Sequence, residues 1–341
     1  MCSRHGRGSS SICGPPAPWD SPTLRGRFWP NVMPCAAPAA AAAAKPAAAG
    51  GCGERGANCS SKPGASRPKG KLEARQARVG VLRAAPARIA RPMDSPLHQR
   101  LRRNLLRLFE RIDHCCASAG RDPKQLRLIA VSKYSTGIET AALAEVLAAV
   151  EQERGAAPGS LPCLGERRVQ DLLQKIDCLE EVEQPVEWHL IGNLQRNKAR
   201  SAVLHASLIH SLDRHEILDR IDKMAEDCGR RVRGLLQFQL SGEDSKHGFL
   251  AEEAAEAFEH ARRLQHIDFV GLMTMAARGT DHESARPCFA QLRELRDEHA
   301  PDWPELSMGM SGDFEGAILE GATLLRVGSI LFQDQDPLSE D

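Results

Sequence analysis

Short apolar runs alternate with amphipathic stretches along the chain from Ser95 onward. The first stretch predicts a helix that ends near Ala119. Its apolar face is formed by Leu97, Leu101, Leu105, Leu108 and Ile112. Eight later runs have the length and character of strands: 128–132, 161–165, 187–192, 207–213, 234–240, 267–275, 306–310 and 323–327. Stretches between them that read as helices include 138–150, 169–179, 250–264 and 284–299.

This alternation indicates an α/β protein with a parallel sheet and helices outside it. Eight such units within about 235 residues favour a single closed (β/α)8 TIM-type barrel, with the first helix completing the outer ring. An open doubly wound sheet is the alternative. Barrel proteins place their sites at the end where the strands finish, which we call the C-terminal rim. The residues expected there include Lys133, Gly165, Gly192, Met275, Met310 and Gly328.

Residues 1–92 differ from the rest: they are rich in Ala, Pro, Gly, Ser and Arg and hold 15 Lys/Arg against 3 Asp/Glu. This composition predicts a disordered low-complexity tail, followed by a barrel domain at 93–335 and a C-terminal tail at 336–341. The N-terminal tail is either an organelle transit peptide, for a plastid or mitochondrion, or an over-extended gene start with Met93 as the true initiator. The second interpretation leaves a cytoplasmic protein.

Charge and cysteine usage exclude some classes of function. Beyond residue 92 the chain holds 30 Lys/Arg against 42 Asp/Glu, which argues against a nucleic-acid-binding core. No apolar run approaches the roughly 20 residues of a membrane span. The 11 cysteines form no Cys-x-x-Cys pair and no His/Cys group with zinc spacing, so no metal site is predicted.

Lys133 follows the first strand run. A buried strand end would desolvate its amine and favour the neutral form, which is a nucleophile toward aldehydes. Two Gly/Ser loops follow the last two strands: Ser311-Gly312, before a short helix at 313–320, and Gly328-Ser329. Barrels often bind phosphate between these loops. The alternative role of Ser311 is to cap the following helix. Capping accounts for this one serine but not for two Gly/Ser loops that face one another. A reactive lysine beside a phosphate site suggests pyridoxal 5'-phosphate (PLP).

Three further polar residues are candidates. Arg326, in an apolar strand, forms either a structural ion pair or a hydrogen bond to the ring nitrogen of a pyridine cofactor. Because arginine keeps its proton, the second role leaves that nitrogen unprotonated and restrains carbanion chemistry. His189 is a candidate cofactor contact, although a satisfied core histidine is the simpler interpretation. Lys246 is expected to be a solvated loop charge.

The motifs match a known family. The sequence resembles the YggS/PROSC-type pyridoxal phosphate homeostasis proteins, whose fold is similar to the N-terminal barrel domain of alanine racemases. The matching strings lie between Leu126 and Phe332, in family order: 130–133, 165–166, 169–170, 188–192, 194–195, 197–198, 245–249, 271–275, 306–311, Asp313 and 326–328.

The resemblance implies PLP held as an internal aldimine on Lys133, with Arg326 facing the pyridine nitrogen. The implied phosphate-binding positions are Ser311, Gly312, Gly328 and Ser329. It also implies a protein that stores, buffers or delivers the cofactor, with PLP-dependent apo-enzymes as candidate recipients, rather than one that turns over a substrate. We expect a monomer or a weak homodimer.

Two features depart from the family pattern. The family usually reads Gly-Glu-Asn where this chain has Gly165-Glu166-Arg167, so Arg167 either reaches the phosphate or points to solvent. A polar insert at 151–160 is expected to be a surface loop before the second strand, away from the rim.

A racemase needs a second base on the opposite face of the substrate α-carbon, which in alanine racemases is a tyrosine from a second, β-rich domain. The single tyrosine here, Tyr134, directly follows Lys133, and adjacent side chains at a strand end point in different directions. The chain also ends soon after Phe332. We therefore expect a PLP-binding protein without robust catalysis. The alternatives are a weak racemase-like PLP enzyme and a phosphate-ligand-binding barrel without PLP, in which Lys133 is only an ion pair.

Overall fold

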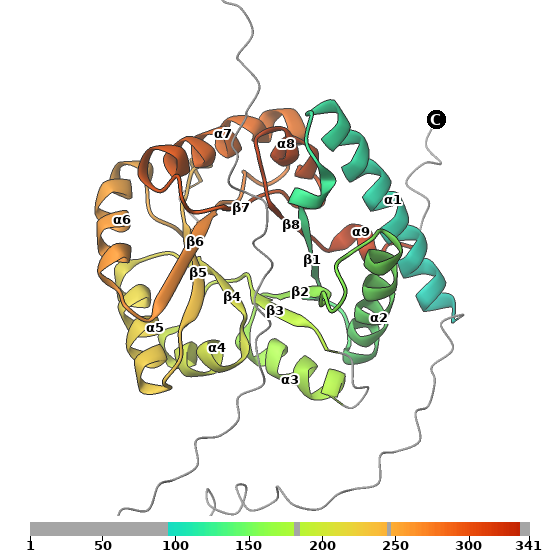
Figure 1. Cartoon of the computed structure of the whole chain (residues 1–341), viewed down its shortest axis with the longest axis horizontal. Helices are drawn as coiled ribbons and strands as arrows, with labels where there is room; N and C mark the ends of the chain where they lie inside the picture. Colours follow the sequence, from blue (N-terminus) through green and yellow to red (C-terminus); the bar gives the residue numbers. More distant parts are fainter. Residues whose placement is uncertain (1–94, 181–184, 244–246, 335–341) are drawn as a thin grey trace, which may run out of the picture. The chain divides into compact units, whose positions relative to one another are not determined.

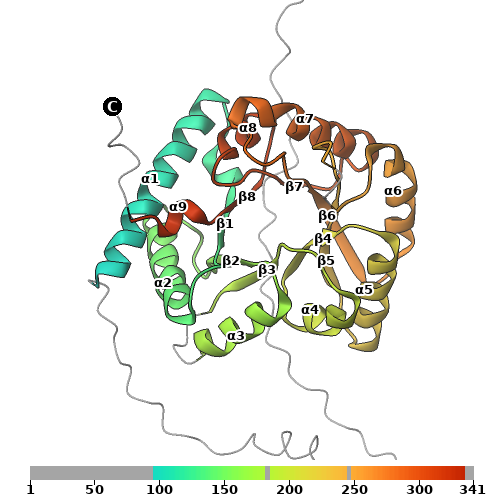
Figure 2. The same ribbon diagram turned by 180° about the vertical axis from the view of Figure 1, so that it is seen from behind.

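Eight parallel strands close into a barrel in chain order in the computed structural model, which describes residues 95–180, 185–243 and 247–334. The strands are β1 (Arg127–Val131), β2 (Cys163–Glu166), β3 (Glu187–Leu190), β4 (Leu208–Leu212), β5 (Val232–Gln237), β6 (Ile267–Met273), β7 (Glu305–Ser307) and β8 (Leu324–Val327). Figures 1 and 2 show them as an inner ring surrounded by helices. The predicted TIM-type barrel is confirmed, and the open sheet is excluded because β1 pairs with β8.

Helices between the strands form the outer ring. The α-helices are α1 (Pro96–Ser118), α2 (Gly137–Glu153), α3 (Val169–Glu180), α4 (Ala199–His205), α5 (His215–Asp227), α6 (Ala254–Arg263), α7 (His282–His299), α8 (Phe314–Leu319) and α9 (Ser329–Phe332). Short 3-10 turns are η2 (Pro123–Gln125), η3 (Arg196–Lys198) and η4 (Ala251–Glu253). As predicted, α1 completes the ring: it packs against α2, α8 and α9 (Figure 1).

One small apolar layer lies in the barrel interior. It consists of Ile129, Cys163, Leu208, Leu235, Met273 and Leu324. A larger apolar layer lies between the strands and the helices and includes Leu101, Leu105 and Leu108 of α1. Each fully buried side chain of this kind stabilises the fold by roughly 1.5–3 kcal/mol. The barrel is therefore a packed core, and ligand access is left to the rims.

The strand register brings the ends of β8, β1 and β2 side by side. Ala130 pairs with Val327 of β8, and Val131 pairs with Gly165 of β2. The loops that follow these strands are therefore neighbours on the C-terminal rim. They contain Lys133, Gly328 and Arg167, three of the site residues predicted from the sequence.

Most predicted boundaries are correct within a few residues. The predicted loop at 151–160 is shorter than expected, because α2 continues to Glu153, and the rest joins α2 to β2 as a largely exposed connection. The predicted tails at 1–92 and 336–341 and the loop residue Lys246 lie outside the described residues. Of the helices that the structure describes, none has both the length and the apolar character to cross a bilayer.

Candidate functional site

Lys133 lies in the tight turn that joins β1 to α2, and its side chain is exposed. The prediction of a buried amine is therefore wrong: β1 ends at Val131, and the turn lifts Lys133 out of the packed layer. Tyr134 is also exposed, at 85%. Its ring centroid lies 4.9 Å from Lys133 Nζ, so the two side chains pack together instead of diverging as expected.

The residue before Lys133 is anchored by several hydrogen bonds. The Ser132 N–H donates to Gly165 O at 3.1 Å, and its hydroxyl donates to Glu166 Oε1 at 2.6 Å. The Ser132 carbonyl accepts from the N–H and the hydroxyl of Ser135, at 2.9 and 2.8 Å. The turn then enters α2 through a capping box between Thr136 and Glu139. Lys133 therefore extends from a firmly held backbone.

The two Gly/Ser loops are joined by a hydrogen bond. The Gly328 N–H donates to Ser311 Oγ at 3.3 Å, so the loops after β7 and β8 face one another as predicted. Gly328 also lies against β1: a Cβ atom added there would be 3.0 Å from the Val131 carbonyl oxygen. These loops therefore share the C-terminal rim with the Lys133 turn.

Several donors in these loops are available to an anion. Ser311 Oγ accepts from Gly328, which leaves the serine O–H to donate. Among the described residues, the N–H groups of Gly312 and Ser329 make no hydrogen bond. A Cβ atom added to Gly312 would meet nothing within 4 Å, so there is space beside it. This chemistry is suited to a phosphate group.

Arg326 is buried, with 4% of its surface exposed. Its guanidinium donates to Ser307 Oγ at 2.6 Å and to the Thr274 carbonyl at 2.8 Å. Within the described part of the chain it forms no ion pair, so the predicted alternative of a structural ion pair is not observed. Burial lowers its pKa to about 10, and it is still charged at neutral pH. The charge of Asp313 opposes this shift in pKa, but no carboxylate forms an ion pair with the guanidinium in the described residues, which leaves it suited to a polar ligand atom.

A chain of buried polar groups runs through the barrel from Arg326. Ser307 Oγ lies 2.8 Å from His210 Nδ1, and His210 Nε2 lies 2.9 Å from His189 Nδ1. Burial lowers the pKa of both histidines, which favours their neutral forms. The other ring nitrogen of His189, Nε2, is buried with no hydrogen-bond partner in the described residues, and Glu187 Oε1 is 3.7 Å away. His189 is therefore not the fully satisfied core histidine of the simpler interpretation.

Arg167 is exposed, and its guanidinium makes no hydrogen bond or ion pair within the described residues. Both predicted alternatives, a reach to the phosphate and an orientation toward solvent, are compatible with this exposure. Its backbone, by contrast, is held in place: its N–H donates to Glu166 Oε2 at 3.3 Å. A Cβ atom on Gly192 would be only 2.3 Å from the Arg167 carbonyl oxygen, so the two loops are in close contact.

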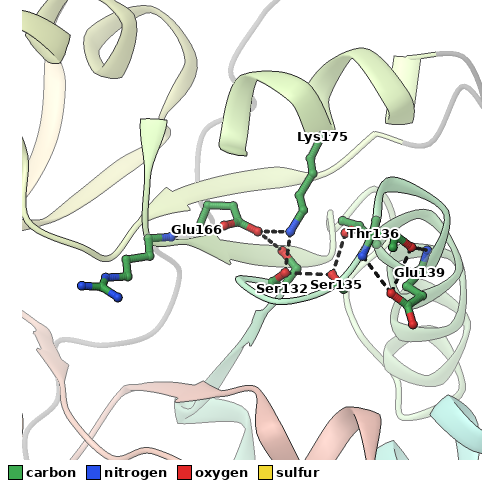
Figure 3. A network of polar contacts seen from close by, with 8 residues as sticks. Ser132, Ser135, Thr136, Glu139, Glu166 and Lys175 are labelled. Atoms are coloured by element: carbon green, nitrogen blue, oxygen red, sulfur yellow. Dashed lines mark hydrogen bonds and ion pairs between the residues drawn. The ribbon is translucent and has the colours of Figure 1, made fainter. Parts of the chain in front are cut away.

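Glu166 and Lys175 were not predicted as site residues. Lys175 Nζ forms a buried ion pair with Glu166 Oε1 and also donates to the Ser132 carbonyl (Figure 3). The sequence did hold a signal, because Lys175 occupies the buried face of α3 with Val169, Leu172 and Leu179. A lysine at such a position is rarely buried without a partner. No group of three or more His, Cys, Asp or Glu in the described residues could hold a metal.

Known proteins are similar to this chain over the barrel. Residues 98–336 match the family model described as alanine racemase, N-terminal domain. A pyridoxal phosphate homeostasis protein from Aquifex aeolicus is 38% identical over 235 residues, which cover 68% of this chain and 96% of the relative. A protein of the same name from Synechocystis is 36% identical over 217 residues, covering 62% and 93%.

A solved structure supports the same assignment. PipY from Synechococcus elongatus, with PLP bound, is 32% identical, with a TM-score of 0.55, and the alignment covers 68% of this chain and 100% of PipY. The family model matches well over half of the chain, and the Aquifex aeolicus relative, 38% identical, is covered over 96% of its length. The chain therefore belongs to the pyridoxal phosphate homeostasis protein family and contains the alanine racemase N-terminal domain.

Proposed function

We propose that this protein binds PLP at the C-terminal rim, as a Schiff base on Lys133, and buffers or delivers it without robust catalysis. The proposal rests mainly on one observation: the Ser311–Gly328 hydrogen bond joins the two anion-binding loops, and Gly328 lies against Val131, two residues before Lys133. A small aldehyde with a phosphate group fits this juxtaposition. The names of the relatives and the PLP bound to PipY support it.

The phosphate would be held by the Ser311 hydroxyl and by the backbone N–H groups of Gly312 and Ser329. These donors are on neighbouring loops at the same end of the barrel. Hydrogen bonds to a charged acceptor contribute about 1.5–3 kcal/mol each. Three such donors account for firm retention of a phosphate ester even before the lysine reacts.

Arg326 would donate to the pyridine nitrogen. PLP supplies an aldehyde, which condenses with an amine with loss of one water, and a ring that stabilises carbanions best when its nitrogen is protonated. An arginine keeps its proton, so the nitrogen opposite it stays an acceptor. The hydrogen bonds to Ser307 and Thr274 hold the guanidinium in one orientation. This arrangement favours holding the cofactor over using it.

The environment of Lys133 is also better suited to release of the cofactor than to turnover of a substrate. Its exposed side chain leaves it open to water or to the amine of an apo-enzyme, either of which can release the cofactor. The only tyrosine of the chain, Tyr134, packs against the Lys133 amine itself and is 85% exposed. It is thus poorly placed to act as a second base on the opposite face of a substrate.

Borohydride reduction tests the proposal directly. The protein is incubated with PLP and reduced, and intact-mass measurement with peptide mapping locates the added pyridoxyl group. We expect one addition, on Lys133, lost in Lys133→Ala and kept in a control at another exposed lysine, Lys124→Ala. An unmodified wild type, or a Lys133→Ala variant with the same addition elsewhere, would refute the assignment. Racemisation of alanine that depends on Lys133 would instead support the enzyme alternative.

A further inference from the structure

The ion pair between Glu166 and Lys175 is deeply buried, although it lies near the C-terminal rim of the barrel. The exposed fraction of the side chain is 0% for Glu166 and 8% for Lys175. Neither group reaches solvent to bind a ligand, and neither belongs to the two phosphate loops. Burying two charges costs solvation energy, which only close partners and additional hydrogen bonds recover. The partners of this pair therefore indicate its role.

Two of the additional hydrogen bonds of the pair converge on the β1 end. Lys175 Nζ donates to the carbonyl of Ser132, and Glu166 Oε1 accepts from the Ser132 hydroxyl at 2.6 Å. Figure 3 shows the three side chains pointing toward one another. Ser132 is thus held at two atoms by a pair whose members come from β2 and α3.

The pair also acts on the second rim loop. Glu166 Oε2 accepts from the Arg167 N–H at 3.3 Å, while Oε1 is used by Ser132 and Lys175. One carboxylate therefore links the backbone after β2 to the Ser132 side chain after β1. The residue directly after Ser132 is Lys133, whose Cα position is set by the Ser132 carbonyl group and the peptide bond that follows.

We propose that Glu166 and Lys175 are positioning residues that hold the Lys133 backbone where its amine meets the aldehyde of the bound cofactor. This inference rests on the proposed function. Small displacements of a reacting group have large effects: a shift of about 1 Å can slow a reaction by roughly 100-fold. Phosphate binding, which depends on the β7 and β8 loops, does not involve the pair.

The test separates covalent attachment of PLP to Lys133 from noncovalent binding of the ring and the phosphate. The main variant is the double substitution Glu166→Gln/Lys175→Met, which leaves no unpaired buried charge. Ser132→Ala is a milder second variant, since it removes only the hydroxyl contact to Glu166. The control is Glu320→Gln/Arg293→Met, which removes both charges of an ion pair of 2.6 Å between α7 and the end of α8. That pair is less buried, and Glu320 also contacts Arg286.

Two quantities are measured for each protein after removal of bound cofactor. The first is the rate at which the Schiff-base absorption band forms on adding PLP. The second is the dissociation constant of pyridoxine 5'-phosphate, which has the ring and phosphate but no aldehyde. We expect the double variant to form the band roughly 10- to 100-fold more slowly with an unchanged dissociation constant. Ser132→Ala should slow it by a smaller factor, and the control should match wild type.

Other outcomes refute the inference. Wild-type rates of band formation in both variants would show that the pair does not position Lys133. Equal losses in band formation and in pyridoxine 5'-phosphate binding, including in Ser132→Ala, would show a general structural role. A wild-type protein that binds pyridoxine 5'-phosphate but forms no band with PLP would refute the proposed function itself, a result distinct from either.

Discussion

Ser311 accepts a hydrogen bond from the Gly328 N–H, and this contact joins two loops that are 17 residues apart in the chain. Because the serine is an acceptor in this bond, its own proton is available to a ligand. The contact therefore both shapes the proposed phosphate site and orients one of its donors.

Ser311→Ala should weaken binding of pyridoxine 5'-phosphate. Loss of one hydrogen bond to a charged group costs about 1.5–3 kcal/mol, so the dissociation constant should rise roughly 10- to 150-fold. Inorganic phosphate, measured as a competitor, should lose affinity as well. Isothermal titration of both ligands checks this, and an unchanged affinity would place the phosphate elsewhere.

Arg326→Lys should weaken binding of pyridoxine 5'-phosphate without changing the affinity for inorganic phosphate. A lysine has a single point-like ammonium and does not reproduce the planar fork that contacts Ser307 and Thr274 together. We expect pyridoxine 5'-phosphate to bind about 10-fold more weakly, which corresponds to about 1.4 kcal/mol. Competition by inorganic phosphate should stay at the wild-type level. If the affinity for inorganic phosphate falls equally, Arg326 acts on the phosphate rather than on the ring.

Gly328→Ala should destabilise the fold, in contrast to Gly312→Ala. A Cβ atom at 328 would be 3.0 Å from the Val131 carbonyl oxygen and 3.1 Å from Val131 Cβ, whereas at 312 it would meet nothing within 4 Å. Overpacking costs typically about 1–3 kcal/mol, and surface changes stay within about 0.5 kcal/mol. Urea denaturation of the cofactor-free proteins gives both free energies of unfolding. Equal stability of the two variants would contradict the close approach of β8 to β1.

Glu151, near the end of α2, should make stability fall as the pH rises. Burial raises its pKa from 4.5 to about 7, although the charge of Arg127 opposes the shift. The folded state thus binds a proton more tightly than the unfolded state, so the free energy of unfolding decreases between about pH 4.5 and 7. Glu151→Gln should remove this pH-dependent contribution to the free energy of unfolding. The variant should be more stable than wild type at pH 8 but not at pH 4.5.

Urea denaturation at the two pH values checks the Glu151 prediction. The control is Glu252→Gln, at an exposed glutamate in η4, which should show the same pH dependence as wild type. A Glu151→Gln variant that keeps the wild-type dependence would show that Glu151 is ionised in the folded protein throughout this range.

Much of the fold could be predicted from the sequence because periodicity is a local property. The spacing of leucines in α1 and the alternation of apolar runs with helices depend on residues within a few positions of one another. Closure of the barrel followed from counting these units. The positions of Lys133, Ser311 and Gly328 at strand ends required only the strand boundaries and the rule that parallel strands finish at one rim.

The exposure of Lys133 was not predictable in this way. A strand run that ends in Ser-Lys suggests a buried amine, but the turn leaves β1 after Val131 and carries the side chain into solvent. Arg326 likewise had two interpretations in the sequence. Only the closed barrel shows that its guanidinium donates to Ser307 and Thr274 and that Asp313 is the carboxylate whose charge acts on it.

The amino-acid sequence alone determined the barrel, its rim and the residue types on that rim, since each follows from patterns along a single stretch of chain. The tertiary structure decided which groups contact: Lys175 with Ser132, 43 residues apart, and His210 with Ser307, 97 residues apart. Such pairs form only when the strands close on one another. Buried charges and hydrogen bonds depend on distance in space, and that distance is not encoded in local periodicity.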